Sequence, residues 1–522
     1  MSSDISERSL EEAIEAALIQ GTQQAVPGGA GFAGEAPAPF VGQPGGYRRR
    51  GSEEYDRPLC LLPRDVADFV LATQPKEWER LKQHYGAAVK EQFVKRVAAE
   101  TERRGTLDVL RQGIKDSGCK FRVAYFRPAS GLNEETRRLH AANLFAVVRQ
   151  LRYSERNEKT LDLVLFLNGI PVFTAELKNP LTGQDVEDAI RQYKTDRDPR
   201  EPLLAYGRCL GHFAVDPDLV YVTTRLAGPK THFLPFNQGK FGGAGNPPVS
   251  PTRQGYPTAY LWEETWARDS VLDLVRQFIH EVDKEDEKGR KTGKRSLIFP
   301  RYQQLGAVRK LVAHARARGA GQHYLIQHSA GSGRSFTIAW LAHQLATLHD
   351  ASDHRVFDSI VVVTDRRVLD RQLQSTMRQF EQTLGVVENI DTTSRQLKEA
   401  LESGKTIIVT TLQKFRPLPS PPRPNPRRSS SSARAALTGN SSLSTCTACA
   451  RRSRRVSSST CWRTTPRIRP TGAFSRKPRA TRATTRRRPS TCSSRSWSCT
   501  RMRSGRRSGS WWSTSPPRCR GR

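Results

Sequence analysis

The sequence has 522 residues, which is long enough for two to four domains of ordinary size. Its formal net charge is +34. No apolar run reaches the ~18 residues of a membrane-spanning helix, and the first residues lack the basic and apolar regions of a secretory signal. Only Cys60, Cys119 and Cys209 precede residue 416, which fits a reducing compartment, so we expect a cytoplasmic protein.

The positive charge is concentrated in the last part of the sequence. Residues 416–522 contain 27 Lys and Arg and no Asp or Glu, so the first 415 residues carry a net charge of only +7. Six of the nine cysteines also lie in this last part. Two different compositions therefore meet near residue 416.

The first third of the chain predicts helices with one strand. Residues 9–20 have a capping box and a helical apolar pattern, and a Gly-, Ala- and Pro-rich loop is expected over 22–52. Residues 55–115 predict mainly helices, residues 121–126 a strand and residues 133–151 another helix.

A β-hairpin is predicted around Asn168-Gly169, the strongest short signal for a type I′ turn, with strands over 161–167 and 170–177. Glu176 and Lys178 then project to one side of the second strand, and the fold-back brings Asp162 towards them. Two carboxylates and an amine suit a Mg²⁺-dependent phosphodiesterase. The same three residues also fit an ordinary solvated strand face, and the pattern alone leaves both interpretations open.

Shorter elements follow the hairpin. Residues 184–194 predict a helix, and short strands are predicted at 213–215, 219–223 and 231–235. The charged residues 281–296 predict a flexible linker.

A second domain is expected from residue 298. A strand over 324–327, a Gly-containing loop over 328–335 and a helix over 336–348 form the order in which backbone N–H groups hold a phosphate. Arg334 and His328 replace the consensus Lys and Gly, so a nucleotide-binding loop and a plain Gly-rich loop both remain open. Strands at 360–364 and 406–411, with a helix over 368–380, predict a parallel α/β sheet.

Ten segments between residues 73 and 415 together resemble the restriction (HsdR) subunit of type I restriction–modification enzymes. They include LDLVLFLNGIPVFTAELKNPLTGQ (161–184), AIRQYKTDR (189–197), IFPRYQQL (298–305), LIQHSAGSGRS (325–335) and VVTDRRVLDRQL (362–373). The resemblance implies an α/β protein with an N-terminal segment, a PD-(D/E)xK endonuclease domain, a linker, an incomplete RecA-like superfamily 2 motor domain and a basic tail. The expected boundaries are 1–54, 55–280, 281–297, 298–415 and 416–522.

The resemblance also implies roles for individual residues. Asp162 and Glu176 bind Mg²⁺, Lys178 completes the catalytic set, and Gln192 and Tyr193 are candidates for a Gln/Tyr-bearing helix beside the site, although they are adjacent rather than spaced Gln-x-x-x-Tyr. The residues expected around ATP are Phe299 and Gln304 near the adenine, and Gly331, Ser332, Gly333, Arg334 and Ser335 at the phosphates, with Ser335 also a Mg²⁺ ligand. Asp365 and Arg366 are expected in a DNA-facing motif.

The implied function is Mg²⁺-dependent cleavage of unmodified double-stranded DNA coupled to ATP-driven translocation, with methyltransferase and specificity subunits as partners and no membrane. After Phe415 the family pattern should continue to an Asp-Glu-Ala-His motif and a second motor domain. Residues 416–522 have no acidic residue to hold Mg²⁺, so ATP hydrolysis and restriction are expected to be defective. The alternative is a non-catalytic DNA-binding remnant or an orphan Mg²⁺-dependent nuclease domain.

The tail from residue 416 is rich in Arg, Ser, Thr and Pro, and is predicted to be disordered. It could be a basic DNA-binding arm, or Cys446 and Cys449 could form half of a zinc site. We favour a third interpretation, in which the tail is an out-of-frame translation of a GC-rich gene.

Overall fold

The computed structural model describes residues 7–20, 45–127, 133–240, 243–249, 255–285, 291–329, 331–364, 367–380, 386–390 and 394–415. The predictions for Asp365, Arg366 and the tail from residue 416 lie outside these residues. Among the helices that the structure describes, none has both the length and the apolar character of a membrane span.

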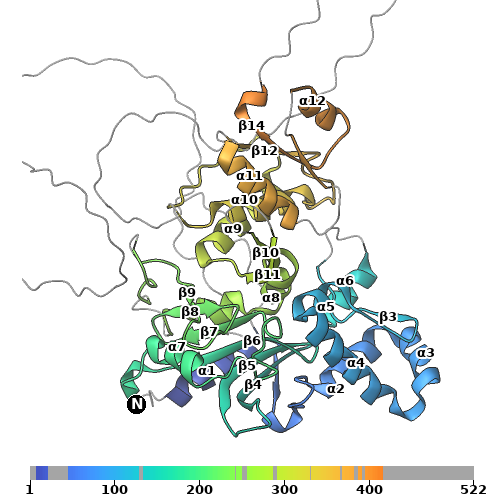
Figure 1. The fold of residues 1–522 in the computed structure, drawn as a ribbon, viewed down its shortest axis with the longest axis vertical. Helices are drawn as coiled ribbons and strands as arrows, with labels where there is room; N and C mark the ends of the chain where they lie inside the picture. The colour runs from blue at the N-terminus through green and yellow to red at the C-terminus, as the bar shows by residue number, and fades with distance from the viewer. Residues whose placement is uncertain are drawn as a thin grey trace, which may run out of the picture. The chain divides into compact units, whose positions relative to one another are not determined.

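A seven-stranded mixed sheet in the order β1-β4-β5-β6-β7-β8-β9 forms the centre of the N-terminal part (Figure 1). β6 pairs in parallel with β7, and the crossover that a parallel pair requires contains α7 (Val186–Thr195). The strands are β1 (Arg48–Arg50), β4 (Phe145–Arg152), β5 (Thr160–Leu167), β6 (Ile170–Leu177), β7 (Gly211–Val215), β8 (Val220–Thr223) and β9 (Leu234–Pro235).

The predicted hairpin is present as β5 and β6, and it contains one extra residue. Asn168 and Gly169 have φ of 51° and 79°, as a type I′ turn requires. Phe166 pairs with Pro171 next to the turn, but Leu165 pairs with Phe173, so Val172 is a β-bulge. Because side chains alternate between faces, the bulge moves every later residue of β6 to the other face relative to β5.

Buried apolar side chains pack on both faces of the sheet. One core joins Val164, Phe166 and Ala214 to Ile190 of α7. The larger core joins the other face of the hairpin to the N-terminal helices. These helices are α1 (Glu7–Gln20), α2 (Pro63–Thr73), α3 (Pro75–Tyr85), α4 (Val89–Arg104) and α5 (Thr106–Gln112), and α8 (Arg268–Asp273) also contributes.

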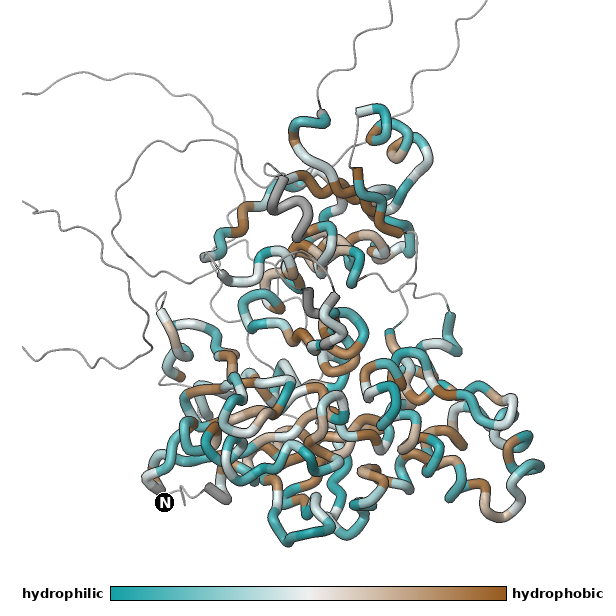
Figure 2. Tube along the Cα trace, in the orientation of Figure 1, coloured by the Kyte–Doolittle hydropathy of each residue, from teal (hydrophilic) through white to brown (hydrophobic). Residues whose placement is uncertain are grey.

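The C-terminal described part contains a parallel sheet in the order β12-β14-β13, which confirms the predicted parallel α/β arrangement. β12 (Ile360–Thr364) and β14 (Ile407–Thr411) are the hydrophobic strands visible in Figure 2, and β13 (Val387–Asn389) is shorter. The helices are α9 (Tyr302–Arg318), α10 (Arg334–Ala346), α11 (Arg367–Gln379) and α12 (Ser394–Glu402).

Three predictions upstream of the hairpin are wrong. Residues 48–50, expected within a loop, form β1, which pairs in parallel with β4. Residues 133–151 divide into α6 (Glu134–Ala141) and strand β4, because the apolar and β-branched run from Phe145 to Val148 is buried on both faces of the sheet. The strand predicted at 121–126 is limited to Phe121, the last residue of β3 (Cys119–Phe121), which pairs with β2 (Ile114–Asp116).

Two further predictions are wrong downstream. Residues expected as a linker form the antiparallel strands β10 (His280–Glu285) and β11 (Lys291–Ile298), where opposite charges such as Arg295 and Glu281 pair across the ribbon at 3.2 Å. Residues 324–327 form no strand. Leu325 is 60% exposed there, because none of the described strands pairs with this segment to bury it.

Candidate nuclease site and nucleotide loop

Asp162 and Glu176 lie on the same face of the hairpin, the face covered by α7. The register after the bulge pairs Leu163 with Ala175, so its continuation sets Asp162 opposite Glu176. The Asp162 carboxylate accepts a hydrogen bond from the backbone N–H of Leu177 at 2.8 Å, which fixes it beside the end of β6. A regular hairpin without the bulge would have placed the two carboxylates on opposite faces.

Glu176 is completely buried and forms an ion pair with Arg197. Its Oε1 accepts a hydrogen bond from Arg197 Nε at 2.6 Å, while Arg197 Nη2 donates to the carbonyl oxygen of Thr160 at 2.6 Å. Arg197 therefore links the start of β5 to the end of β6. Burial, together with the negative charge of Asp162, raises the pKa of Glu176 well above its ordinary range, and the charge of Arg197 opposes this increase.

The Oε2 atom of Glu176 is buried and has no hydrogen-bond partner among the described residues. A buried carboxylate oxygen needs a partner, so this oxygen is suited to a cation or a water molecule. Across the ranges that the structure describes, no three His, Cys, Asp or Glu side chains form a ligand cluster. The pair Asp162 and Glu176 nevertheless fits Mg²⁺, which commonly takes one or two carboxylates and keeps several waters.

The other predicted nuclease residues differ in their surroundings. Lys178 follows the last residue of β6, its side chain is buried, and its N–H donates to the carbonyl oxygen of Val215. Tyr193 is buried on α7, where its hydroxyl and Thr174 Oγ1 lie 2.8 Å apart. Gln192 is partly exposed and, within the described residues, makes no side-chain hydrogen bond to either carboxylate.

Sequence reasoning missed three residues around the carboxylates. Arg197 ends a segment that carried the family resemblance, but its distance from Glu176 in sequence gave no signal of contact. Gln150 Nε2 donates to Asp162 Oδ1 at 3.2 Å and to Glu11 Oε1 at 2.8 Å, and so connects α1 to the site. Burial and the charge of Asp162 raise the pKa of Glu11.

The bulge at Val172 did have a signal in the sequence. Proline within a strand often marks a bulge, and Pro171 is adjacent to Val172.

The Gly-containing loop over 328–335, the candidate nucleotide loop, is held to the preceding helix α9 by Gln304. Gly331 and Gly333 have φ of 74° and 80°, and Gly333 caps the N-terminus of α10. Gln304 Nε2 donates to the carbonyl oxygens of Ser332 and Gly333 at 3.0 and 2.9 Å. A Cβ on Gly333 would lie 2.5 Å from Gln304 Nε2, the movable end of a side chain, and the positive φ of Gly333 is the stronger reason for glycine here.

The side chains of the loop show where it departs from the consensus. Arg334 is exposed and Ser335 is half-buried. Burial and the charge of Arg334 lower the pKa of His328. The Oγ of Ser332 is buried and has no hydrogen-bond partner among the described residues.

Phe299, expected near the adenine, lies in a different environment from Gln304. Its ring contacts Phe173, Phe213 and Phe236, with centroids 5.7–6.0 Å apart, and only 8% of the residue is exposed. Little of this ring remains to stack on a base. Gln304, through its bonds to the loop, is the better placed of the two.

Two family models match the chain. Residues 66–231 match the N terminus of the type I restriction enzyme R protein, and residues 303–443 match the SWI2/SNF2 ATPase. The first match contains the hairpin with both carboxylates, and the second contains the candidate nucleotide loop. Over these two regions the chain is similar to the type I restriction enzyme R (HsdR) subunit family.

Curated HsdR relatives are similar over the same part of the chain. The HindI endonuclease subunit of Haemophilus influenzae is 28% identical over 290 residues, which is 52% of this chain and 25% of the relative. The SauCOLORF180P endonuclease subunit of Staphylococcus aureus is 22% identical over 273 residues, 52% of this chain and 26% of the relative. The alignments thus span about a quarter of these HsdR subunits.

Proposed function

We propose that this chain is the restriction subunit of a type I enzyme, with a Mg²⁺-dependent nuclease site at Asp162 and Glu176. The observation that carries the proposal is the pairing of two buried carboxylates on one face of the hairpin, with Glu176 Oε2 lacking a partner among the described residues. The substrate would be unmodified double-stranded DNA. The partners would be methyltransferase and specificity subunits, and the cytoplasm would be the location.

In this proposal Asp162 and Glu176 hold the metal. A bound Mg²⁺ would polarise the phosphoryl group and lower the pKa of a water molecule. Arg197 fixes the orientation of Glu176 through its bond to Oε1, and Leu177 N–H fixes that of Asp162. Lys178 is the candidate to stabilise negative charge on the phosphate, and Tyr193 supports the sheet face through Thr174.

The nucleotide site of the proposal is the loop from Gly331 to Ser335 at the N-terminus of α10, where helix dipole and backbone N–H groups favour phosphate. Gln304 would hold this loop in place, and Ser335 would be the Mg²⁺ ligand. Arg334 replaces a compact lysine charge with a planar guanidinium. Since residues 416–522 also supply no acidic residue, we propose ATP binding with impaired hydrolysis.

The test is Mg²⁺-dependent cleavage of plasmid DNA by the full chain and by Glu176→Ala. Even loss of a ligand's supporting partner costs about 10–100-fold, so we expect the variant to lose about 100-fold or more. Glu158→Ala is the matched control, since this glutamate is 70% exposed, and it should cleave as the wild type does. Equal cleavage by Glu176→Ala and the control would refute the site.

A non-catalytic DNA-binding remnant is the second candidate, and the 27 basic residues of the tail favour it. It predicts no Mg²⁺-dependent cleavage by the wild type, together with tight, salt-sensitive DNA binding that survives Glu176→Ala. Ending the chain at Phe415 should then abolish the binding. Binding that is unaffected by this truncation would reject the second candidate.

A further inference from the structure

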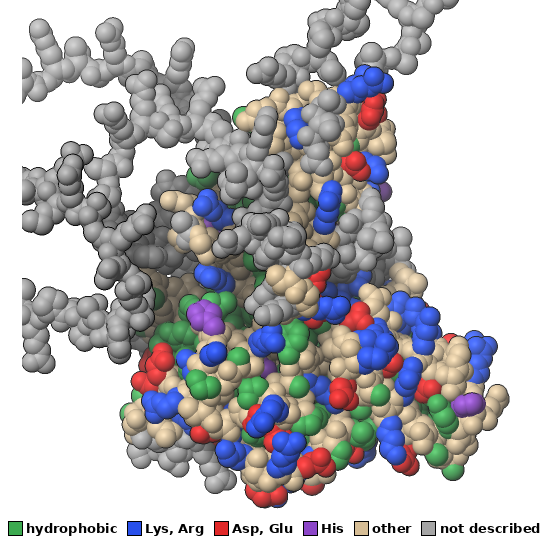
Figure 3. Space-filling model, in the orientation of Figure 1, with side chains coloured by type: hydrophobic (Ala, Val, Ile, Leu, Met, Phe, Trp, Pro, Cys, Tyr) green, Lys and Arg blue, Asp and Glu red, His purple; other side chains and the backbone are tan. Residues whose placement is uncertain are grey.

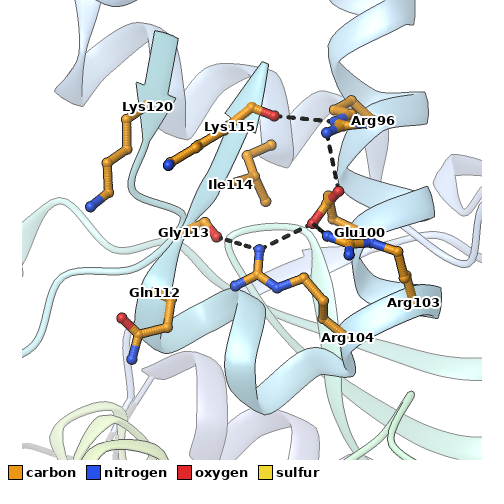
Figure 4. Close-up of a pocket in the computed structure, with 9 residues that line it drawn as sticks. All are labelled: Arg96, Glu100, Arg103, Arg104, Gln112, Gly113, Ile114, Lys115 and Lys120. Carbon is orange, nitrogen blue, oxygen red and sulfur yellow. Dashed lines mark hydrogen bonds and ion pairs between the residues drawn. The ribbon is translucent and has the colours of Figure 1, made fainter. Parts of the chain in front are cut away.

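A basic pocket lies in the N-terminal part, apart from the two carboxylates. It has a volume of about 370 Å³ and lies between α4 and the β2–β3 hairpin (Figure 4). Neither Asp162 nor Glu176 lines it, and Figure 3 shows Lys and Arg side chains gathered over the region of α4 and α5. Its charged lining residues are Arg96, Arg103, Arg104, Lys115, Lys120 and Glu100.

Glu100 organises the arginines of this pocket. Its carboxylate is 5% exposed and binds Arg103 Nη2 at 2.7 Å, Arg104 Nη1 at 3.1 Å and Arg96 Nη2 at 3.2 Å. Glu100 orients three guanidinium groups, and Asp108 also pairs with Arg104, so two carboxylates offset two of the three arginine charges and the two lysines add to the remaining one. The arrangement keeps N–H donors in fixed positions with excess positive charge, which suits bidentate recognition of phosphate.

The two lysines supply a second, independent observation. Lys115 and Lys120 are directly opposite each other on β2 and β3, and both are exposed. Like charges in this position destabilise a hairpin unless an anion compensates them. Within the described residues, neither lysine forms an ion pair with an acidic side chain, so the hairpin keeps both charges available.

The hairpin is held firmly beside the helix. Gly113 packs so closely on β3 that a Cβ there would lie 2.1 Å from the carbonyl oxygen of Phe121. The Gly113 carbonyl oxygen also accepts a hydrogen bond from Arg104 at 3.0 Å, and that of Lys115 accepts one from Arg96 at 3.2 Å. These bonds hold the hairpin that carries Lys115 and Lys120 beside the helix that carries the arginines, and all five basic residues line the pocket.

We propose that this pocket binds phosphate groups, either in the backbone of a DNA duplex or as free phosphate. Its volume admits a phosphate group, and its donors come from two elements that the hydrogen bonds of Arg96 and Arg104 hold together. If the ligand is DNA, the proposal rests on the proposed nuclease function and adds a contact outside the cleavage site.

Lysine footprinting of the full chain tests the pocket directly. The protein is acetylated with and without a 20-base-pair duplex, in the absence of Mg²⁺, and each lysine is quantified by mass spectrometry. We expect several-fold protection of Lys115 and Lys120, and none of the exposed Lys76 and Lys90, which do not line the pocket. Protection by inorganic phosphate but not by DNA would identify free phosphate as the ligand. Unprotected Lys115 and Lys120 with both ligands would overturn the proposal.

A pair of variants gives the second measurement. Lys115→Gln/Lys120→Gln should weaken duplex binding and reduce the salt dependence of log K by about 1 for each phosphate that is no longer neutralised. Lys76→Gln/Lys90→Gln removes the same charge elsewhere and should change neither quantity. The basic tail is present in both variants, so its contribution cancels. Equal effects in the two variants would refute a specific pocket.

The test of the phosphate pocket can be distinguished from the test of the nuclease site. Glu176→Ala should leave the protection of Lys115 and Lys120 intact, because Glu176 does not line the pocket. Protection without any cleavage would count against the proposed function alone. Cleavage without protection would count against the pocket alone.

Discussion

Arg197 supplies the positive charge that pairs with Glu176, one of the two buried carboxylates. The side chains of Arg197 and Glu176 are 4% and 0% exposed, so neither partner has water as a substitute. Removal of one member of a buried pair is costly because the remaining charge is left uncompensated. Glu176 can take up a proton, which moderates the cost. Arg197 thus positions Glu176, a role that its place in the sequence does not reveal.

We expect Arg197→Ala to lower the free energy of unfolding by about 3 kcal/mol, the low end for a broken buried pair. It should also weaken Mn²⁺ binding, because Glu176 loses its orientation. Arg197→Lys keeps the charge but cannot bond to both Glu176 and Thr160, so it should be intermediate. Thermal unfolding and calorimetric titration of Mn²⁺ measure the two effects. Wild-type values for Arg197→Ala would contradict the assigned role.

A second single residue, His212, makes the free energy of unfolding depend on pH. Its burial lowers its pKa from 6.5 to about 3, and its Nδ1 lies 2.8 Å from Thr174 Oγ1. The unfolded chain takes up a proton below pH 6.5 while the folded one does not, so this stability is complete above pH 6.5 and is lost on acidification. By pH 5.5 the loss should be about 1.4 kcal/mol.

His212→Gln should therefore have a flatter stability profile than the wild type between pH 7 and 5.5 in denaturant titrations. The same substitution at the exposed His354 is the control and should leave the profile unchanged. Parallel profiles for His212→Gln and the wild type would show that His212 does not account for the slope.

How far the site follows from sequence depends on the residue. Asp162 and Glu176 could be proposed because a local hairpin with a strong Asn-Gly signal brings their strands together, but their common face depends on the bulge, which the prediction did not include. Glu11, Gln150 and Arg197 reach the site through long-range packing of α1, β4 and the segment after α7. No local periodicity encodes those contacts, so single-sequence reasoning could not have found them.

At the scale of elements, predictions succeeded where a local rule decides the conformation. The turn at Asn168-Gly169 and the amphipathic helix α7 follow from such rules. The prediction for residues 133–151 failed because the second half of this segment belongs to the middle of a sheet whose neighbours are distant in sequence. Tertiary burial there overrode the helical pattern.

Gly169 allows a test of the hairpin. Its φ is +79°, and a Cβ would lie 2.6 Å from both the Leu62 carbonyl oxygen and a Val66 methyl carbon. Gly118 has the same φ with no atom within 4 Å, so it is a matched control. Gly118→Ala should cost about 1–2 kcal/mol from backbone strain. Gly169→Ala should cost about 1–3 kcal/mol more in chemical unfolding, from the clash. Equal losses of unfolding free energy in the two variants would show that Leu62 and α2 move aside and relieve the clash.

At the scale of the whole molecule, the change of composition at residue 416 is the dominant feature. The match to the SWI2/SNF2 ATPase runs to residue 443, beyond the predicted boundary at 415. We predict that resequencing codons 405–430 will reveal a downstream frame that encodes an Asp-Glu-Ala-His motif. A confirmed frame as printed would instead support a natural chain whose motor lacks that acidic site.

The bulge at Val172 has a consequence for alignments of such hairpins. A gap-free alignment with a nuclease hairpin of regular strands would set Ala175, and not Glu176, opposite the aspartate. A one-residue gap at Val172 aligns Glu176 with the second acid again. The gap reflects the extra residue in this strand and is not an alignment error. Motif searches that fix the interval between the two acids would therefore overlook relatives that differ only in whether they contain this extra residue.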